Sequence, residues 1–328
     1  SDATAGVTVN LATGIAQGDA SVGTDTLSGI EKVIGSSHDD TLTGSGTYSE
    51  YFSPGAGNDY IDGVAGYDTV SYATATAGLS VNMADGIVTG DASVGTDTLR
   101  GIEIVSGTNF ADTFDTRGYT AFYATNPSAN VDNGLFGKKY SEFEGRAGDD
   151  TIIGNGNTAI SYLNASEAVS VNLGTGIATG GASVGTDHFS GVSQVTGSAF
   201  ADTFVGGTAF VSPGYIGSES FRGLAGNDSI DGGDGNDSIN GDNGNDVLLG
   251  GNRLDTIDGG LGDDIISGGG YQDSLIGNYG NDTIDGGGAS DVILAGVGLD
   301  VVHGGTGDDM IFGGEDDDTL IGEGGNDS

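Results

Sequence analysis

The sequence predicts an all-β solenoid, in which very short strands stack coil upon coil in parallel. Three observations in its 328 residues predict this fold. Aspartate recurs at every ninth position from Asp228 to Asp327, an aliphatic residue follows each of the first eleven aspartates by two positions, and 66 glycines supply turns. A fixed period of this length is typical of solenoids, in which one repeat cannot bury its apolar side chain alone.

The repeating unit reads G-G-x-G-[ND]-D-x-U-x, where U is aliphatic. Glycine pairs such as Gly232-Gly233 allow the backbone angles of a tight turn. The triplet D-x-U then forms a strand whose aliphatic residue points inward, because side chains alternate between faces. With two repeats per coil, the inward residues form two columns: Ile230, Leu248, Ile266, Ile284, Val302 and Leu320, facing Ile239, Ile257, Leu275, Ile293 and Ile311.

Stacking also aligns the aspartates along two edges. One edge carries Asp228, Asp246, Asp264, Asp282, Asp300 and Asp318, and the other carries Asp237, Asp255, Asp273, Asp291, Asp309 and Asp327. Like charges at this spacing repel one another, so the folded state needs counter-ions. Ca²⁺ suits these turns because it accepts about six to eight oxygen ligands, including backbone carbonyls. Zn²⁺ prefers Cys and His, and the chain has no cysteine and three histidines.

With twelve near-continuous nonapeptides, the C-terminal tract resembles the RTX family, also called haemolysin-type calcium-binding repeats. The resemblance implies a right-handed parallel β-roll or β-helix with calcium-binding turns. Each Ca²⁺ would lie between a turn and the turn 18 residues on, held by the aspartates of both and by turn carbonyls. The resemblance also implies export from a bacterium by type I secretion.

The predicted calcium ligands are therefore aspartates at the sixth position of the unit. In the regular tract they are Asp228, Asp237, Asp246, Asp255, Asp264, Asp282, Asp291, Asp300, Asp309, Asp318 and Asp327. Earlier ordinary repeats add Asp59, Asp68 and Asp150, and degenerate repeats add Asp40, Asp112 and Asp202. At Arg253 and Tyr271 a side chain replaces the fourth-position glycine, which either weakens calcium binding or only reshapes the loop.

Residues 1–222 carry three longer repeats, at about 1–46, 73–118 and 163–207, built around GDASVGTDTL and its copies. Their offsets are multiples of 18, which predicts that they form one continuous solenoid with residues 223–328. An aromatic insertion follows each long repeat, near residue 47, from Asp115 to Glu144 and near residue 208. These insertions could bind a carbohydrate or another subunit. We favour the alternative that they cover an edge of the solenoid.

Composition excludes several functions. A net charge of -40 disfavours nucleic acid and anionic membranes as partners. No apolar run is long enough for a transmembrane helix. His38, His188 and His303 lie far apart in the sequence without metalloprotease spacing, and the chain has neither a G-x-S-x-G motif nor a P-loop. We therefore expect no catalytic residues and no enzyme activity.

These observations predict a calcium-binding structural segment of a secreted or cell-surface bacterial protein, which folds on extracellular Ca²⁺. One alternative is a self-assembling subunit of an extracellular filament or surface layer. Another is an accessory module of a secreted enzyme, toxin or adhesin. Both ends fall within repeats, so we expect a segment cut from a longer solenoid. The expected partners are calcium, a second copy bound end to end, and a carbohydrate or surface ligand.

Overall fold

The computed structural model describes residues 3–119, 140–207 and 217–328. Its 31 strands are the only regular elements of these residues, which contain no helix that could span a membrane. The strands confirm the predicted all-β solenoid, because most of them pair in parallel with a strand one coil away. The chain divides into two compact units, Ser1–Ser161 with Ala182–Val192, and Tyr162–Gly181 with Ser193–Ser328.

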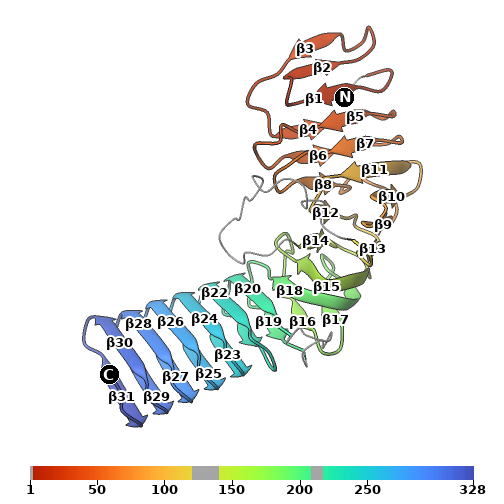
Figure 1. Ribbon diagram of the computed structural model, residues 1–328. Coiled ribbons are helices and arrows are strands. Elements are labelled where there is room, and N and C mark those ends of the chain that lie inside the picture. Colours follow the sequence, from red (N-terminus) through yellow and green to blue (C-terminus); the bar gives the residue numbers. More distant parts are fainter. Residues whose placement is uncertain (1–2, 120–139, 208–216) are drawn as a thin grey trace. The chain divides into compact units, whose positions relative to one another are not determined.

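The second unit contains the regular nonapeptide tract. Its strands are β16 (Ser170–Asn172), β17 (Ile177–Thr179), the end of β18 (Thr186–Thr196), β19 (Thr203–Val205), β20 (Ser220–Ala225), β21 (Ser229–Asp231), β22 (Ser238–Asn243), β23 (Val247–Asn252), β24 (Thr256–Leu261), β25 (Ile265–Gly270), β26 (Ser274–Tyr279), β27 (Thr283–Gly288), β28 (Val292–Val297), β29 (Val301–Thr306), β30 (Met310–Glu315) and β31 (Thr319–Gly324). From β20 onward, each strand pairs in parallel with the strand two further along, so two parallel ladders run side by side (Figure 1).

The pairing register confirms both predicted columns of aliphatic residues. Ile230 lies opposite Leu248, and Ile239 lies opposite Ile257, each 18 residues on. Side chains in both columns are 0–1 % exposed from Ile230 to Val302. The column residues of the last coil are more open, and Leu320 is 46 % exposed. Each coil therefore obtains its core by stacking on its neighbours.

The first unit is built in the same way, with larger core residues. Its strands are β1 (Thr8–Asn10), β2 (Ile15–Gln17), β3 (Thr24–Thr26), β4 (Lys32–Ile34), β5 (Thr41–Thr43), β6 (Tyr51–Ser53), β7 (Tyr60–Asp62), β8 (Thr69–Ser71), β9 (Ser80–Asn82), β10 (Ile87–Thr89), β11 (Thr96–Arg100), β12 (Ile104–Ser106), β13 (Thr113–Asp115), β14 (Ser141–Glu144), β15 (Thr151–Ser161) and the start of β18. One inner column contains Val33, Phe52, Val70, Val105 and Phe143. Phe143 stacks on Phe114 with ring centroids 4.8 Å apart.

The long repeats depart from the purely parallel arrangement that the sequence predicted. Each begins with an antiparallel hairpin, formed by β1 with β2, by β9 with β10 and by β16 with β17. In the second repeat, β11 pairs with the hairpin and also in parallel with β7. The alternating pattern of VTVNL and its copies fits either strand direction, so the sequence pattern alone did not reveal these hairpins.

The first aromatic segment, near residue 47, supplies a coil of the solenoid. Phe52 lies on β6 and is fully buried in the inner column, and Glu50 stands two residues before it, where other coils have aspartate. Phe143, near the end of the second aromatic segment, is also a core residue. Residues 120–139 and 208–216, which hold most of the other two segments, lie outside the described residues.

Candidate calcium-binding turns

In the regular tract, the aspartates form two continuous carboxylate rows. The backbone N–H of each aspartate donates a hydrogen bond to Oδ1 of the aspartate one coil further on, at 2.7 Å from Asp228 to Asp246 and 2.8 Å from Asp246 to Asp264. The same bond joins Asp237 to Asp255 at 2.8 Å. The first row continues to Asp318 and the second to Asp327, as predicted.

The second carboxylate oxygen of these residues has no hydrogen-bond partner within the protein. Buried Oδ2 atoms of this kind belong to Asp228, Asp237, Asp246, Asp255, Asp264, Asp273, Asp282, Asp291, Asp300 and Asp309, and in the first unit to Asp59, Asp68, Asp97 and Asp150. An unpaired buried polar atom costs about 1–3 kcal/mol, and more when it is charged. A periodic row of such atoms indicates positions for a cationic ligand.

Glycine turns bring backbone carbonyls close to the same rows. Gly244 has a φ of 145°, and a methyl group there would overlap the carbonyl oxygen of Gly226 in the preceding coil. The same overlap would arise between Gly262 and Gly244, where φ is 128°. Only glycine allows this backbone angle together with this close approach. The turns therefore offer carbonyl oxygens beside the carboxylates.

The donor set fits Ca²⁺, which takes carboxylate and carbonyl oxygens in flexible geometry. No cluster of three or more His, Cys, Asp or Glu side chains that could hold a metal occurs among the described residues. Side chains of two neighbouring coils would therefore have to share an ion with turn carbonyls. In the regular tract, the carboxylates of such pairs as Asp246 and Asp264 would hold it, and the ion would neutralise their charge.

Burial gives these carboxyl groups a strong preference for the neutral form. Loss of solvation raises the pKa of Asp255 to about 8 and the pKa of Asp264 and Asp291 to about 7, with neighbouring aspartates adding to the rise. Burial also raises the pKa of Asp282 to about 6. Without a cation, ionised rows would therefore destabilise the coil at neutral pH.

The first unit has carboxylate rows of its own, which include acids that the sequence pattern missed. The N–H of Asp59 donates to Oδ1 of Asp97 at 2.9 Å, and the N–H of Asp150 donates to Oδ1 of Asp187 at 3.0 Å. Glu50 donates its N–H to Asp68 at 2.7 Å. In the second unit, Glu219 occupies a row position that the sequence pattern missed. Asp273, which the sequence placed on the second edge but not among the predicted calcium ligands, occupies its row position as well. An acid two residues before a buried apolar residue identifies all of these positions, as in Asp97-Thr98-Leu99.

The three degenerate repeats place Asp40, Asp112 and Asp202 in the rows, but both carboxylate oxygens of each have local partners. In Asp40, Oδ2 accepts the N–H of Ser36 at 2.5 Å and Oδ1 accepts the Ser36 hydroxyl at 2.8 Å. These three aspartates therefore have no buried carboxylate oxygen without a partner, which is the feature that indicates a cation in the regular tract.

The turns at Arg253 and Tyr271 are reshaped without interruption of the carboxylate row. Both residues have a positive φ, 87° and 86°, well below the 128–147° of the glycines at Gly244, Gly262 and Gly298 on the other edge. Asp255 still donates its N–H to Asp273 at 2.8 Å. The reshaped loop was one of the two outcomes expected from the sequence, and the strength of calcium binding there stays a prediction.

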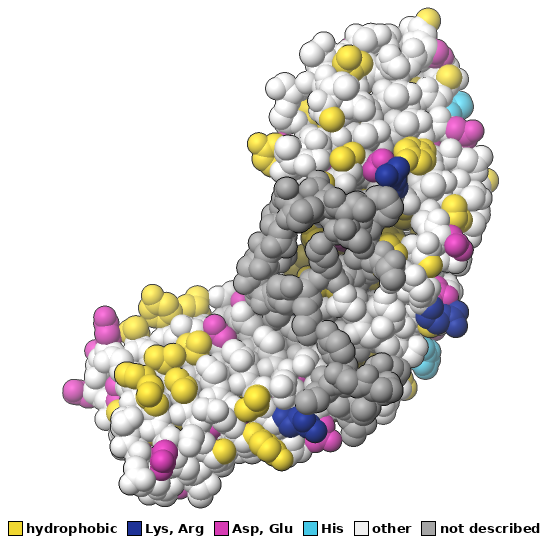
Figure 2. Space-filling view, viewed as in Figure 1, with side chains coloured by type: hydrophobic (Ala, Val, Ile, Leu, Met, Phe, Trp, Pro, Cys, Tyr) yellow, Lys and Arg dark blue, Asp and Glu magenta, His cyan; other side chains and the backbone are white. Residues whose placement is uncertain are grey.

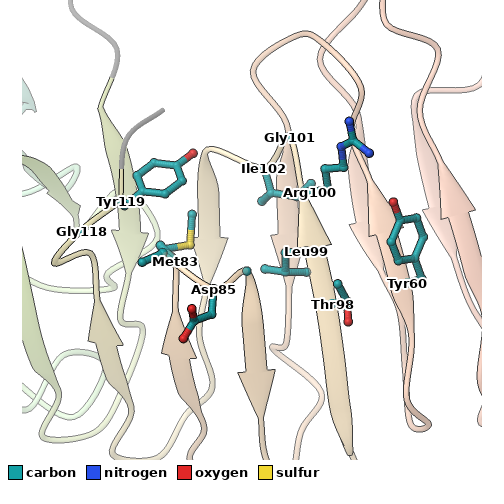
Figure 3. A pocket seen from close by; sticks show the side chains of 12 residues that line it. Tyr60, Met83, Asp85, Thr98, Leu99, Arg100, Gly101, Ile102, Gly118 and Tyr119 are labelled. Carbon is teal, nitrogen blue, oxygen red and sulfur yellow. The ribbon is translucent and has the colours of Figure 1, made fainter. Parts of the chain in front are cut away.

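Few acidic side chains of the rows reach the surface, and in Figure 2 the acidic groups on the visible face are scattered. The pocket in Figure 3, about 370 Å³, lies beside the second hairpin and is lined by Tyr60, Asp85, Arg100 and Tyr119 among others. Asp85 and Arg100 point in different directions there, and Arg100 faces Asp62 at 3.9 Å. The first long repeat has a similar pocket of about 430 Å³ at Leu11 and Leu27. Because a pocket of this kind occurs beside the hairpin in both of these long repeats, we attribute it to the place where the hairpin strands leave the stacked coil.

The predicted surface or turn positions of the histidines agree with the structure. His303 is partly exposed, and its Nδ1 lies 2.9 Å from Oε1 of Glu323. His38 follows a turn serine and His188 is exposed on β18. These contacts place the described histidines outside the carboxylate rows.

The family model of the RTX calcium-binding nonapeptide repeat (4 copies) matches residues 55–70, 142–158, 213–248, 240–270, 267–302 and 295–328. The matched segments contain Asp59, Asp68, Asp150 and every nonapeptide aspartate from Asp228 to Asp327. No curated protein matches the chain.

Proposed function

Through its nonapeptide repeats the chain belongs to the RTX calcium-binding family, and on this premise we propose that it is a structural segment of a secreted or cell-surface bacterial protein. RTX repeats are calcium-binding modules typical of type I secreted proteins. The segment folds when Ca²⁺ outside the cell bridges its carboxylate rows.

One observation carries this proposal: the rows of buried carboxylate oxygens without partners, such as Oδ2 of Asp246, Asp264 and Asp282. Each is less than 2 % exposed as a residue, and its neighbour in the row is another acid. A cation between neighbouring coils supplies the missing partner and removes the repulsion between the carboxylates. Ion binding and coil formation are therefore coupled.

The coupling makes folding depend on calcium concentration. A ligand that binds only the folded state stabilises it by RT ln(1 + [L]/Kd), and several ions multiply the effect. In a calcium-poor compartment the ionised rows oppose stacking, and the chain stays unfolded. Abundant calcium outside the cell reverses this balance.

The test is a calcium titration of the metal-free chain at pH 8, followed by far-ultraviolet circular dichroism. We expect little regular structure without calcium and a cooperative gain of β-structure above a threshold concentration. Mg²⁺ at matched ionic strength is the control for screening, since it demands strict octahedral geometry and retains its waters. Full β-structure in the metal-free chain at pH 8, or an equal response to Mg²⁺, would refute the proposal.

A further inference from the structure

Three acidic turns supply from their own residues the contacts that the regular turns lack. We call them the capped turns: Ser36 to Asp40, Thr108 to Asp112, and Ser198 to Asp202. In each, the Ser or Thr four residues before the aspartate donates its backbone N–H to Oδ2, at 2.5, 2.7 and 2.6 Å. Its hydroxyl donates to Oδ1, at 2.8, 2.9 and 2.8 Å.

The hydroxyl is itself held in place by the turn. It accepts the backbone N–H of the residue two positions on, which is His38 at 3.2 Å, Phe110 at 3.0 Å and Phe200 at 3.1 Å. This local bond holds the hydroxyl oxygen in place. In two of the turns a backbone carbonyl is a second possible acceptor of the hydroxyl proton, that of His38 at 3.4 Å and that of Phe110 at 3.1 Å, but Oδ1 of the aspartate is nearer in both. Both oxygens of each aspartate are thereby satisfied, and none of the three aspartates has a buried oxygen without a partner.

The backbone of the capped turns also differs from that of the turns matched by the RTX repeat. Four residues before the aspartate, those turns have a positive φ whether or not glycine is present, as at Val64 (69°), Arg146 (68°) and Gly251 (104°). Ser36, Thr108 and Ser198 are not among the described residues with positive φ. The RTX repeat model likewise leaves Asp40, Asp112 and Asp202 outside its matched segments.

Each capped turn stands at the start of a carboxylate row. Oδ1 of Asp40, Asp112 and Asp202 accepts a backbone N–H from Val7, Leu79 and Val169, at 2.7, 2.9 and 2.7 Å. These three donors are apolar residues beside the hairpin strands of the long repeats, so no acid precedes the aspartate in its row. An ion on that side would find a carboxylate on one coil only.

We propose that Ser36, Thr108 and Ser198 take the place of calcium at the first acid of three rows, so that Asp40, Asp112 and Asp202 bind no ion. The donated N–H and O–H groups stabilise the carboxylate where a row begins, and calcium starts with the next pair of coils. This inference rests on the proposed function, because it assumes that the other row carboxylates hold calcium. It removes Asp40, Asp112 and Asp202 from the calcium ligands predicted from the sequence.

The test compares two matched variants, Asp202→Asn in a capped turn and Asp264→Asn in a regular turn. Bound calcium is counted by equilibrium dialysis at saturating concentration, and circular dichroism checks that each variant retains the β-signal. We expect Asp264→Asn to bind fewer calcium ions than the unchanged protein and Asp202→Asn to bind the same number. An equal loss in both variants would overturn the capping proposal and leave the proposed function standing. No loss in either would instead refute calcium binding by the rows.

Asparagine at position 202 would place an NH₂ group against an N–H donor, which could prevent folding. Ser198→Ala therefore serves as the second variant, because it removes only the hydroxyl. We expect a lower thermal unfolding temperature with an unchanged calcium count. A lower calcium count in a variant with the native β-signal would overturn the proposal, since it would mean that this turn takes part in binding an ion.

Discussion

Acid should substitute for calcium in this fold. The aspartates of the rows have a pKa near 3.8 in an unfolded chain, whereas burial raises the pKa of Asp264 to about 7 and that of Asp282 to about 6 in the ion-free coil. A group with a raised folded pKa stabilises the fold fully below its unfolded pKa, and this contribution disappears as pH rises through the folded pKa. The ion-free coil should therefore gain stability as pH falls from 8 to 5.

The magnitude follows from the two pKa values of each group. Between pH 8 and pH 5, linkage gives about 3 kcal/mol for Asp264 and about 1 kcal/mol for Asp282. Both residues are 1 % exposed, and loss of solvation is the main cause of both pKa shifts. Several such groups lie in each row, so their combined contribution is comparable to the stability of a typical domain, about 5–15 kcal/mol.

The assay is circular dichroism of exhaustively dialysed, metal-free protein at pH 8, 7, 6 and 5, with thermal melts at each pH. No chelator is present, because chelators lose calcium affinity in acid. We expect the β-signal and the unfolding temperature to rise as pH falls. The exposed Asp25 provides a control, since Asp25→Asn should leave the slope unchanged while Asp264→Asn reduces it. A β-signal that stays flat or decreases between pH 8 and pH 5 would contradict the reasoning.

Four substitutions, one of them a control, test the packing of the coils in the calcium-loaded protein. Leu248→Ala removes a side chain that is 0 % exposed and should cost about 2–5 kcal/mol in urea denaturation; a cost below about 1 kcal/mol would contradict the stacked-core model. Gly262→Ala should raise the calcium needed for folding, because the methyl would overlap the Gly244 carbonyl, whereas Ala289→Gly at the matching position should not. Leu254→Asn should raise the free energy of unfolding by about 0.5–1.5 kcal/mol, because it supplies a side-chain oxygen that can accept a backbone N–H, as Oδ1 of Asn236 accepts that of Leu254. An unchanged unfolding midpoint would refute this.

The sequence was sufficient to predict the two inner columns and the two rows of the regular tract. A period of nine with two repeats per coil fixes the register completely, so Leu248 must lie on Ile266 once Ile230 lies on Leu248. The period could not show how neighbouring carboxylates meet. In the structure one oxygen of each accepts an N–H from the preceding coil, and only the other oxygen needs a cation.

Irregular spacing concealed the rows of the first unit. Asp97 lies 38 residues after Asp59, and Asp150 lies 38 residues after Asp112, because a hairpin or a longer segment intervenes while the spatial register is kept. A search for a fixed interval therefore fails at these positions. The local triplet of an acid, any residue and a buried apolar residue is retained, and it identifies Asp97 because Leu99 is buried.

The first carboxylate of a row has different electrostatic surroundings from the carboxylates inside the row. Inside a row, each carboxylate has a neighbour on both sides, and a cation can be shared. The first acid of a row has no carboxylate on the preceding coil with which to share a cation. At the capped turns, N–H and hydroxyl groups of the chain bind its carboxylate instead. Asp40 has the N–H and hydroxyl of Ser36. Glu50 and Glu219, the first acids of the remaining rows, differ: Oε1 accepts the backbone N–H of Ser45 at 3.0 Å and of Gly207 at 3.1 Å, but Oε2 of each is buried without a partner. In the three rows that begin at capped turns, protein donors would satisfy the first acid and cations the acids from the second onward. The long repeats would then set where calcium binding starts in these rows.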